Sequence, residues 1–318
     1  MTRQTPPRGG TELAGHLTRF ARFLARREQR EREDSASLAD LAARPLPLPD
    51  GVDLRWLGVA GYRLSYEGQA LYVDPYVSRV PLRAWLSKQP ALADLGLHDK
   101  LFGAERDRVA GILVGHTHFD HAIDVPALAR RWETNAYGSR SLKHLMSLYG
   151  LAERSVEVEP RKEFELGPFA VTFFPSLHSK LLLGYKVPAD GELSCEHLDG
   201  LAAGEYRCGD IYGIRIRVGG ASFYHQGSAN LIDDLVPRGG VDVFLAGIAG
   251  RSFTPDYWSR ILPRLEPRIV VASHFDDFFR RVDDPFGFSL NVNLTALPEE
   301  IHSVSREFDV RAMTPAPR

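Results

Sequence analysis

The sequence from residue 111 to residue 124 reads Gly111-Ile112-Leu113-Val114-Gly115-His116-Thr117-His118-Phe119-Asp120-His121-Ala122-Ile123-Asp124. Its first four residues form a short apolar run, which predicts a buried strand that leads into a polar loop. Imidazole and carboxylate groups at the end of a buried strand are costly in free energy unless something pairs them. A divalent metal ion is the natural partner for this mixture, so the stretch predicts a metal site.

The spacing of these side chains indicates how they would share metal ions. His116 and His118 are two residues apart, so on an extended segment both rings point to one side and can bind one ion. Asp120 and His121 follow where the loop turns into a helix, and they can face a second ion. Imidazole together with carboxylate suits zinc best, with manganese or iron as alternatives. We therefore expect one or two zinc ions here.

Other histidines of the chain also follow apolar runs. His178, His225 and His274 each come at the end of a predicted strand, as His116 does. A lone histidine at such a place is more often an ordinary loop residue, but repetition of the placement favours a shared site. A closed first site needs a third imidazole, and His178 is the candidate that we expect to supply it.

Composition limits the classes of function. The 318 residues are 44% hydrophobic, enough for one large domain or two small ones. The 39 Lys and Arg residues nearly balance 41 Asp and Glu residues, which provides no overall field for nucleic acid. Cys195 and Cys208 make no disulfide framework, and no long apolar segment is present. We expect a soluble, cytoplasmic protein that acts on a small molecule.

Residues 1–50 are predicted to be an N-terminal extension, ahead of one large domain in residues 51–318. A helix is predicted over residues 11–34, with an apolar stripe at Leu13, Leu17, Phe20 and Leu24. Membrane contact through this helix is one alternative, but the glutamates between its arginines favour packing on the protein's own domain. The Pro-rich residues 44–51 predict a stiff linker.

Two further interpretations concern residues near the predicted site. Asp74 follows the predicted strand 70–73; it either caps the turn or accepts a ring N–H from a metal-bound histidine and fixes its tautomer. Residues 76–108 predict a helical cover beside the site, with His98 on the surface. A closing helix is predicted over residues 297–308.

Residues 52–310 resemble the metallo-β-lactamase superfamily. The hallmark His-x-His-x-Asp-His of that superfamily is present from His116 to His121, and its later histidine motifs match His178 and His274. Its Asp after the third strand matches Asp74. Two short motifs are most similar to the branch of L-ascorbate-6-phosphate lactonase and N-acylphosphatidylethanolamine phospholipase D; they are Trp56-Leu57-Gly58-Val59-Ala60-Gly61 and Tyr224-His225-Gln226-Gly227.

The resemblance implies an α/β or α+β fold, a four-layer αβ/βα sandwich with the metals at one edge of its two sheets. It implies a first metal site of His116, His118 and His178. It also implies a second metal site, of Asp120, His121 and His274. The match of Asp74 supports its role as acceptor for a metal-bound histidine.

The chain departs from the branch at two places. The usual Gly-His-Ala is Gly58-Val59-Ala60, and the usual Gly-Asp-Thr, whose Asp bridges both metals, is Gly227-Ser228-Ala229. A neutral hydroxyl cannot replace a bridging carboxylate. The second site is then held by a bridging water, as in one β-lactamase subclass, or it is weak or empty. Ser228 is a candidate to bind that water, and Asn230 or His225 are candidates to compensate.

The expected function is a metal-dependent hydrolase that uses metal-bound hydroxide to cleave an ester, lactone or amide bond. Asp120 would orient the nucleophile or hold the second metal, and His225 and Ser228 are the further catalytic candidates. The alternatives are a phospholipase D-like phosphodiesterase on the same site, or a metal-binding protein with a degenerate second site. A nuclease and a di-iron oxygenase are less favoured, the latter because such enzymes tend to carry a carboxylate at the position of His118.

Overall fold

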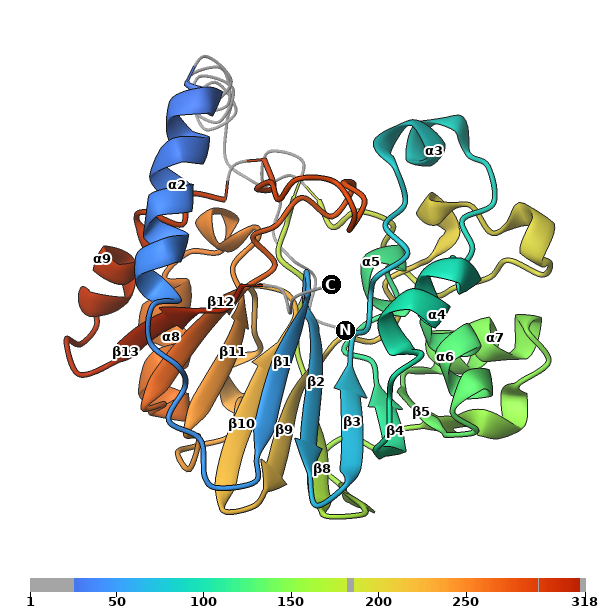
Figure 1. The fold of residues 1–318 in the computed structure, drawn as a ribbon, viewed down its shortest axis with the longest axis horizontal. Coiled ribbons are helices and arrows are strands. Elements are labelled where there is room, and N and C mark those ends of the chain that lie inside the picture. Colours follow the sequence, from blue (N-terminus) through green and yellow to red (C-terminus); the bar gives the residue numbers. More distant parts are fainter. Residues whose placement is uncertain (1–25, 182–185, 291, 315–318) are drawn as a thin grey trace.

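The computed structural model describes residues 26–181, 186–290 and 292–314. A six-stranded and a seven-stranded sheet pack against each other, and helices cover their outer faces (Figure 1). The order of layers is helices, sheet, sheet, helices. This arrangement is the predicted four-layer sandwich.

The six-stranded sheet has the strand order β1-β2-β3-β4-β5-β6. The first three strands are antiparallel to one another, and β3 to β6 run parallel. The strands are β1 (Asp53–Gly58), β2 (Gly61–Tyr66), β3 (Gln69–Val73), β4 (Arg108–Leu113), β5 (Ala136–Gly138) and β6 (Ser155–Glu157). The predicted buried strand at residues 111–114 overlaps the last three residues of β4.

The seven-stranded sheet has the order β13-β12-β11-β10-β9-β8-β7. Its strands are antiparallel from β7 to β10 and parallel from β10 to β13. They are β7 (Glu163–Leu166), β8 (Phe169–Pro175), β9 (Tyr212–Val218), β10 (Ala221–Gln226), β11 (Val243–Gly247), β12 (Ile269–Ser273) and β13 (Asp309–Ala312). Strand β13 follows the predicted closing helix of residues 297–308, and no strand was predicted there.

The helices lie on both outer faces and above the edge where the site forms (Figure 1). The α-helices are α2 (Arg27–Leu41), α3 (Leu82–Ser87), α4 (Leu95–Phe102), α5 (Phe119–Ala122), α6 (Val125–Arg131), α7 (Arg140–Leu148), α8 (Tyr257–Leu265) and α9 (Leu297–His302). Short 3-10 helices are η1 (Ala152–Arg154), η2 (Leu198–Gly200), η3 (Ala203–Glu205), η4 (Asp233–Leu235) and η5 (Arg251–Phe253).

Alternation along β3 shows why both faces of the first sheet are buried. Leu71 and Val73 belong to the core between the two sheets, whereas Ala70 and Tyr72 belong to the core under the helices. Successive side chains of a strand point to opposite faces, so an apolar residue at every position serves two cores. The site therefore rests on a support that is packed from both sides.

Helix α2 packs on the C-terminal part of the second sheet. It contacts β13 and buries Leu38 and Leu41 in the core between the sheets. The buried Asp34 accepts a hydrogen bond from the backbone N–H of Thr295 at 2.9 Å. The predicted stripe at residues 13–24 lies outside the described residues, and the division at residue 50 stays a prediction. No helix in the described part of the chain is both long and apolar enough to cross a bilayer.

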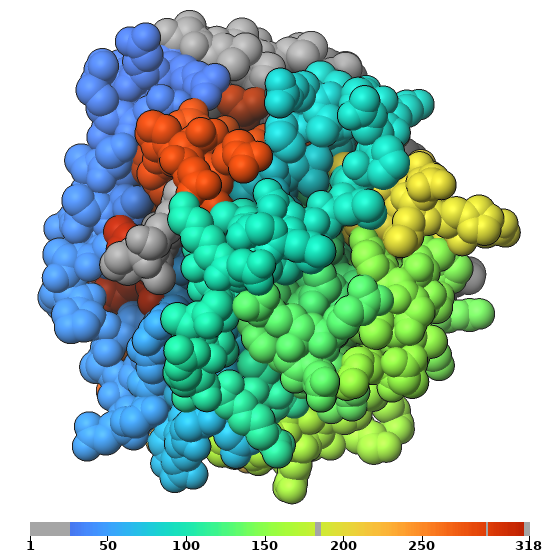
Figure 2. All heavy atoms as spheres, turned by 45° about the vertical axis from the view of Figure 1, so that its right-hand side comes forward, coloured from blue at the N-terminus to red at the C-terminus, as the bar shows by residue number. Residues whose placement is uncertain are grey.

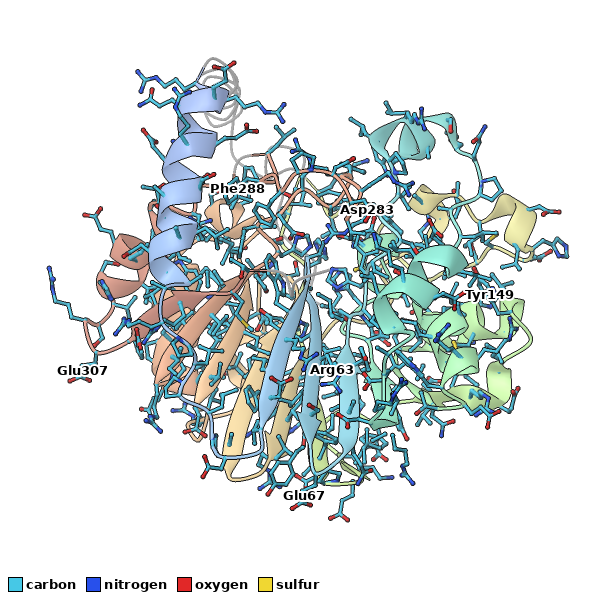
Figure 3. The ribbon with its side chains drawn as sticks, viewed as in Figure 1. Arg63, Glu67, Tyr149, Asp283, Phe288 and Glu307 are labelled. Atoms are coloured by element: carbon cyan, nitrogen blue, oxygen red, sulfur yellow. The ribbon has the colours of Figure 1, made fainter. Side chains whose placement is uncertain are left out.

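A charged network covers one face of β2 and β3. The guanidinium of Arg63 donates to Glu105 at 2.7 and 2.9 Å and to Asp107 at 2.6 Å, and the Tyr72 hydroxyl also donates to Glu105 (Arg63 is labelled in Figure 3). Burial alone would raise the pKa of Glu105, but the hydrogen bonds from Arg63 and Tyr72 outweigh it and lower that pKa from 4.5 to about 2. The ionised carboxylate is the form that the fold favours.

Glu105→Gln is expected to reduce the pH dependence of stability under acidic conditions. The folded pKa of Glu105 lies below its unfolded value, so its contribution is complete above about pH 4.5 and is lost as the pH falls toward 2. The variant should be less stable than the parent at pH 7, and the difference should shrink below pH 4. Urea unfolding at several pH values measures this, with the exposed Glu307→Gln as control. A difference that stays constant from pH 7 to pH 3 would contradict the network.

Candidate metal centre

The predicted ligands come together where strands end at one edge of the sandwich. His116 and His118 follow β4, His178 follows β8, and His274 follows β12. Asp74 follows β3, which is parallel to β4, so their carboxyl ends meet at the same edge. The histidines that follow apolar strands therefore lie together because the ends of these strands meet at one edge, as expected.

Two buried groups of three possible ligands lie at this edge. The first is His116, His118 and His178, and the second is Asp120, His121 and His274; within each group the ligand atoms lie within 4.8 Å of one another. In the first group the centroids of the rings are 4.8 to 4.9 Å apart. The sets are the two that the resemblance implies.

Hydrogen bonds to the first group leave one nitrogen of each ring for a metal. Nε2 of His118 donates to the carbonyl of Pro188 at 2.9 Å, and Nδ1 of His178 donates to the carbonyl of Ser179 at 2.7 Å. Nε2 of His116 is buried and has no hydrogen-bond partner. A buried polar atom without a partner needs an explanation, and a metal ion provides one for a nitrogen lone pair.

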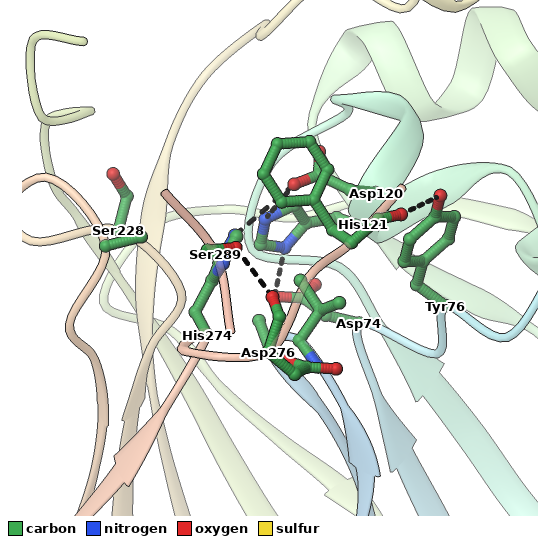
Figure 4. A network of polar contacts seen from close by, with 12 residues as sticks. Asp74, Tyr76, Asp120, His121, Ser228, His274, Asp276 and Ser289 are labelled. Carbon is green, nitrogen blue, oxygen red and sulfur yellow. Dashed lines mark hydrogen bonds and ion pairs between the residues drawn. The ribbon is translucent and has the colours of Figure 1, made fainter. Parts of the chain in front are cut away.

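The second group is organised around the carboxylates of Asp74 and Asp120 (Figure 4). Nδ1 of His121 donates to Asp74 Oδ2 at 2.8 Å, which turns Nε2 toward Asp120 Oδ2 at 3.9 Å. Nε2 of His274 lies 3.3 Å from the same Asp120 oxygen. Asp120, His121 and His274 therefore face one another, and Asp74 lies behind His121.

The electrostatics differ between the two groups. Burial and the neighbouring imidazoles lower the pKa of His116 well below 6.5, and burial lowers that of His178 to about 3. Burial would also lower the pKa of His121, but Asp74 and Asp120 outweigh it and raise that pKa. The first group thus holds the neutral imidazoles that bind metal, and the carboxylates of the second group favour a positive charge between them.

Asp74 has the contacts that the second of its two predicted roles requires. It is fully buried, and Oδ1 accepts the backbone N–H of Gly115 at 2.7 Å while Oδ2 accepts the ring of His121. The bond to His121 fixes which nitrogen of that ring is free, as expected of a carboxylate behind a metal ligand.

His225 lies beside Asp74 and belongs to neither group of possible ligands. Its Nε2 donates to the carbonyl of Ala60 at 2.9 Å and is 3.7 Å from Asp74 Oδ2. The ring is fully buried and meets the edge of Tyr62. His225 therefore adjoins Asp74, and its predicted catalytic role stays a prediction.

Ser228 and Asn230 both hold the turn that carries His178. The backbone N–H of Ser179 donates to the Ser228 hydroxyl at 3.0 Å, and the Asn230 side chain donates to the carbonyl of His178 at 3.1 Å. Figure 4 shows Ser228 apart from His121 and His274. The structure therefore gives Ser228 a partner other than a metal-bound water, and the predicted catalytic role of its hydroxyl is left as a proposal without geometric support.

Ser228→Ala is expected to destabilise the metal-free protein by about 1–3 kcal/mol, because the buried N–H of Ser179 loses its acceptor. Denaturant unfolding without metal measures this, and Ser259→Ala, which removes an exposed hydroxyl on α8, is the control. Unchanged stability combined with a large loss of hydrolysis would instead favour a catalytic hydroxyl.

The backbone around His274 is held in a conformation that is uncommon for these residues. Val59, Asp74 and His274 have φ values of 51°, 42° and 56°, which side-chain-bearing residues seldom adopt. The His274 N–H donates to the Val59 carbonyl at 2.7 Å, and Asp276 accepts the Val59 N–H at 2.8 Å. Strained backbone gathered at one place is typical of a functional site.

A buried network beside the motif was missed. His98, expected on the surface, is 2% exposed, and its Nε2 lies 2.7 Å from Asp124 Oδ1. Asp124 also accepts the backbone N–H groups of Val77 and Ser78 at 2.7 and 3.0 Å. The prediction for His98 was wrong because the carboxylate that pairs with it is 26 residues away in sequence. This network fixes the segment after Asp74 over the start of α6.

The donors fit divalent metals. Five imidazoles and one carboxylate, each buried, form two neighbouring sets of nitrogen and oxygen ligands. The orphaned Nε2 of His116 and the ring hydrogen bonds of His118, His121 and His178 are those expected of histidine ligands. The identity of the metal is not fixed by these contacts, since zinc, manganese and iron all accept such ligands.

Comparisons with known proteins show the family of the chain. The family model for the β-lactamase superfamily domain matches residues 71–275, well over half of the chain. The chain belongs to this superfamily. A UPF0173 metal-dependent hydrolase from Staphylococcus aureus (strain MRSA252) is 28% identical over 241 residues, which cover 73% of this chain and 93% of the relative. A second such relative, from S. aureus strain JH9, has the same identity and coverage.

Two solved structures share the fold. The metallo-β-lactamase fold protein YhfI from Bacillus subtilis aligns with a TM-score of 0.51 and 16% identity, over 82% of this chain and 95% of that one. The diiron β-hydroxylase CmlA from Streptomyces venezuelae aligns with a TM-score of 0.52 and 16% identity, over 86% of this chain and 54% of that one. At such identities the likeness shows the fold alone.

The predicted superfamily and fold are thus confirmed, and so is the prediction of an enzyme at the level of a metal-dependent hydrolase. The special closeness to the branch of the lactonase and the phospholipase D stays a prediction. The bond cleaved, the metal and the compartment also stay predictions.

Proposed function

We propose that the protein hydrolyses a carboxyl ester, lactone or amide at a pair of adjacent metal sites. The observation that carries this proposal is the convergence of two buried three-ligand groups at one edge of the sandwich. His116, His118 and His178 would hold the first metal, and Asp120, His121 and His274 the second. Bound there, divalent metals lower the pKa of a water toward neutrality and polarise the bond to be cleaved.

The residues of the chain supply orientation and charge. Asp74 holds His121 with Nε2 free, and the turn of Ser228 and Asn230 holds His178. Asp120 Oδ2 lies between the rings of His121 and His274, where it can ligate a metal and accept a hydrogen bond from the attacking water. The proposal gives Asp120 the role of orienting the nucleophile.

The surroundings favour a neutral carboxyl substrate over a phosphodiester. The ring of Phe278 lies 6.0 Å from that of His274, and Phe119 is the residue between the ligands His118 and Asp120. Aromatic rings beside the ligands disfavour the permanent charge of a phosphodiester more than a neutral ester. The phosphodiesterase and the metal-binding protein with a degenerate second site remain the alternatives.

The test is hydrolysis by the purified chain after removal of metal and reconstitution with Zn²⁺, Mn²⁺ or Fe²⁺. The substrates are p-nitrophenyl acetate, γ-butyrolactone and bis(p-nitrophenyl) phosphate. We expect the ester or the lactone to be cleaved at least about tenfold faster than the phosphodiester, a difference of about 1.4 kcal/mol in activation free energy. Preference for the phosphodiester would favour the alternative enzyme, and less than one bound metal per chain with no cleavage would favour the degenerate protein.

A further inference from the structure

The most exposed of the large apolar side chains gather in two segments of the described chain, 82–95 and 286–290. They are Leu82, Trp85, Leu86, Leu92, Leu95, Phe286 and Leu290. None of the side chains of α3 is buried, and Trp85 and Leu86 are 40% and 65% exposed. Apolar groups gathered on a soluble protein mark a binding site more often than an accident of folding.

A line of aromatic rings leads from this surface to a predicted metal ligand. The ring centroid of Trp85 lies 6.1 Å from that of Phe279, Phe279 lies 4.3 Å from Phe278, and Phe278 lies 6.0 Å from His274. We call Trp85, Phe279 and Phe278 the aromatic strip. It is half-exposed along its length, since Phe278 and Phe279 are neither buried nor fully exposed.

The strip is supported from below. The ring of Phe119 lies 6.1 and 6.2 Å from those of Phe278 and Phe279. The buried Tyr76 donates its hydroxyl to the carbonyl of Phe278 at 2.9 Å, a contact drawn in Figure 4. In Figure 2 the segment that follows His274 (orange) lies against the segment that contains α3 (cyan). A strip fixed in this way is preorganised for a ligand.

We propose that the aromatic strip binds the acyl chain of the substrate, which makes the enzyme a hydrolase of amphiphilic esters or lactones. This inference rests on the proposed function and adds the substrate class. The strip begins at solvent and ends on His274. An acyl chain that lies along it would therefore place its carboxyl end at the proposed metal sites. The strip carries no charged group, so it selects length and apolarity rather than a polar motif.

The test compares p-nitrophenyl acetate, butyrate, hexanoate and octanoate with metal-loaded enzyme below the solubility limit of each ester. All four esters release the same p-nitrophenol, so differences in kcat/KM between them come from the acyl chain. Each added CH₂ buried on the strip should raise kcat/KM by about two- to fourfold, so octanoate should exceed acetate by at least about 60-fold. In Trp85→Ser this ratio should fall at least about fivefold, because the outer end of the strip is lost.

The control is Phe308→Ala, which removes a partly buried aromatic ring next to Glu307, on the opposite side of the molecule (Glu307 is labelled in Figure 3). It should leave the octanoate-to-acetate ratio unchanged. A ratio near one in the parent enzyme, with acetate still cleaved, would overturn the inference and leave the proposed function standing. An unchanged ratio in Trp85→Ser would overturn it as well.

A binding measurement separates the inference from catalysis. Calorimetric titration of the metal-free chain with octanoate and butyrate should show binding of octanoate only, and Trp85→Ser should weaken it. That result supports the strip even if no ester is cleaved, in which case the proposed function alone fails. Absence of octanoate binding would overturn the inference if the chain instead floated with phosphatidylcholine vesicles in a Trp85-dependent way, because the surface would then bind a bilayer. It would also overturn the inference if the chain formed a dimer that Trp85→Ser dissociates, because the surface would then bind a second copy.

Discussion

Replacing His116 with alanine is expected to lower kcat/KM for ester hydrolysis by more than about 100-fold. Removing a residue that only hydrogen-bonds to a metal ligand already lowers metal affinity or activity by about 10- to 100-fold, and His116 is proposed to be a ligand itself. His116 is 2% exposed, and its free Nε2 faces the rings of His118 and His178. Two imidazoles are too few to close the first site. Metal content by atomic emission and initial rates measure the effect.

The matched control is His302→Ala on α9. The ring of His302 contacts the Phe308 carbonyl at 3.2 Å and belongs to neither group of ligands. This variant should keep both metal content and rate within about twofold, as expected of surface substitutions that contribute little. Activity of His116→Ala within tenfold of the parent, at equal folding, would be incompatible with the proposed first site.

Asp74→Asn is expected to weaken metal binding at the second site by about 10- to 100-fold, although the residue touches no metal in our account. The buried carboxylate accepts from both His121 Nδ1 and the Gly115 N–H. The amide of asparagine accepts hydrogen bonds only at its oxygen. Its NH₂ group would therefore face one of these two N–H donors, which would lose its acceptor. Titration with Zn²⁺ in the presence of a competing chromophoric chelator gives the affinity of each site.

Asp124→Asn is the matched control for this prediction. Asp124 is likewise fully buried, but it pairs with His98 and with the backbone of residues 77 and 78. The variant should lose stability and keep the zinc affinity of the second site. Equal losses of zinc affinity in the two variants would show that Asp74 acts through the general stability of this edge, and not on His121.

The convergence of the candidate ligands could be predicted from the sequence because their arrangement is local or repeated. His116, His118, Asp120 and His121 lie on one loop after β4, so their spacing alone places them together. His178 and His274 each follow an apolar strand, and a sheet brings the ends of such strands to one edge. Hydrophobic periodicity is enough to find these strands, and the layer order came from the resemblance.

The sequence could not place the side chains and strands whose arrangement depends on distant partners. Ser228 and Asn230 were placed correctly after β10, but Ser179 and His178 bind them, and no local pattern indicates this. His225 lies within β10, where side chains alternate between the two faces of the sheet. Its hydrogen bond is to the carbonyl of Ala60, which is 165 residues away in sequence. Strand β13 was missed because it forms by pairing with β12, which no local pattern indicates.

The most direct test of the central claim is a crystal structure of the zinc-loaded chain with anomalous diffraction recorded on both sides of the zinc edge. The account predicts one zinc peak among His116, His118 and His178, and a second among Asp120, His121 and His274. A single peak in the first group would still support that group and would leave the second site degenerate. Absence of zinc from both groups, with zinc bound elsewhere on the chain, would contradict the account.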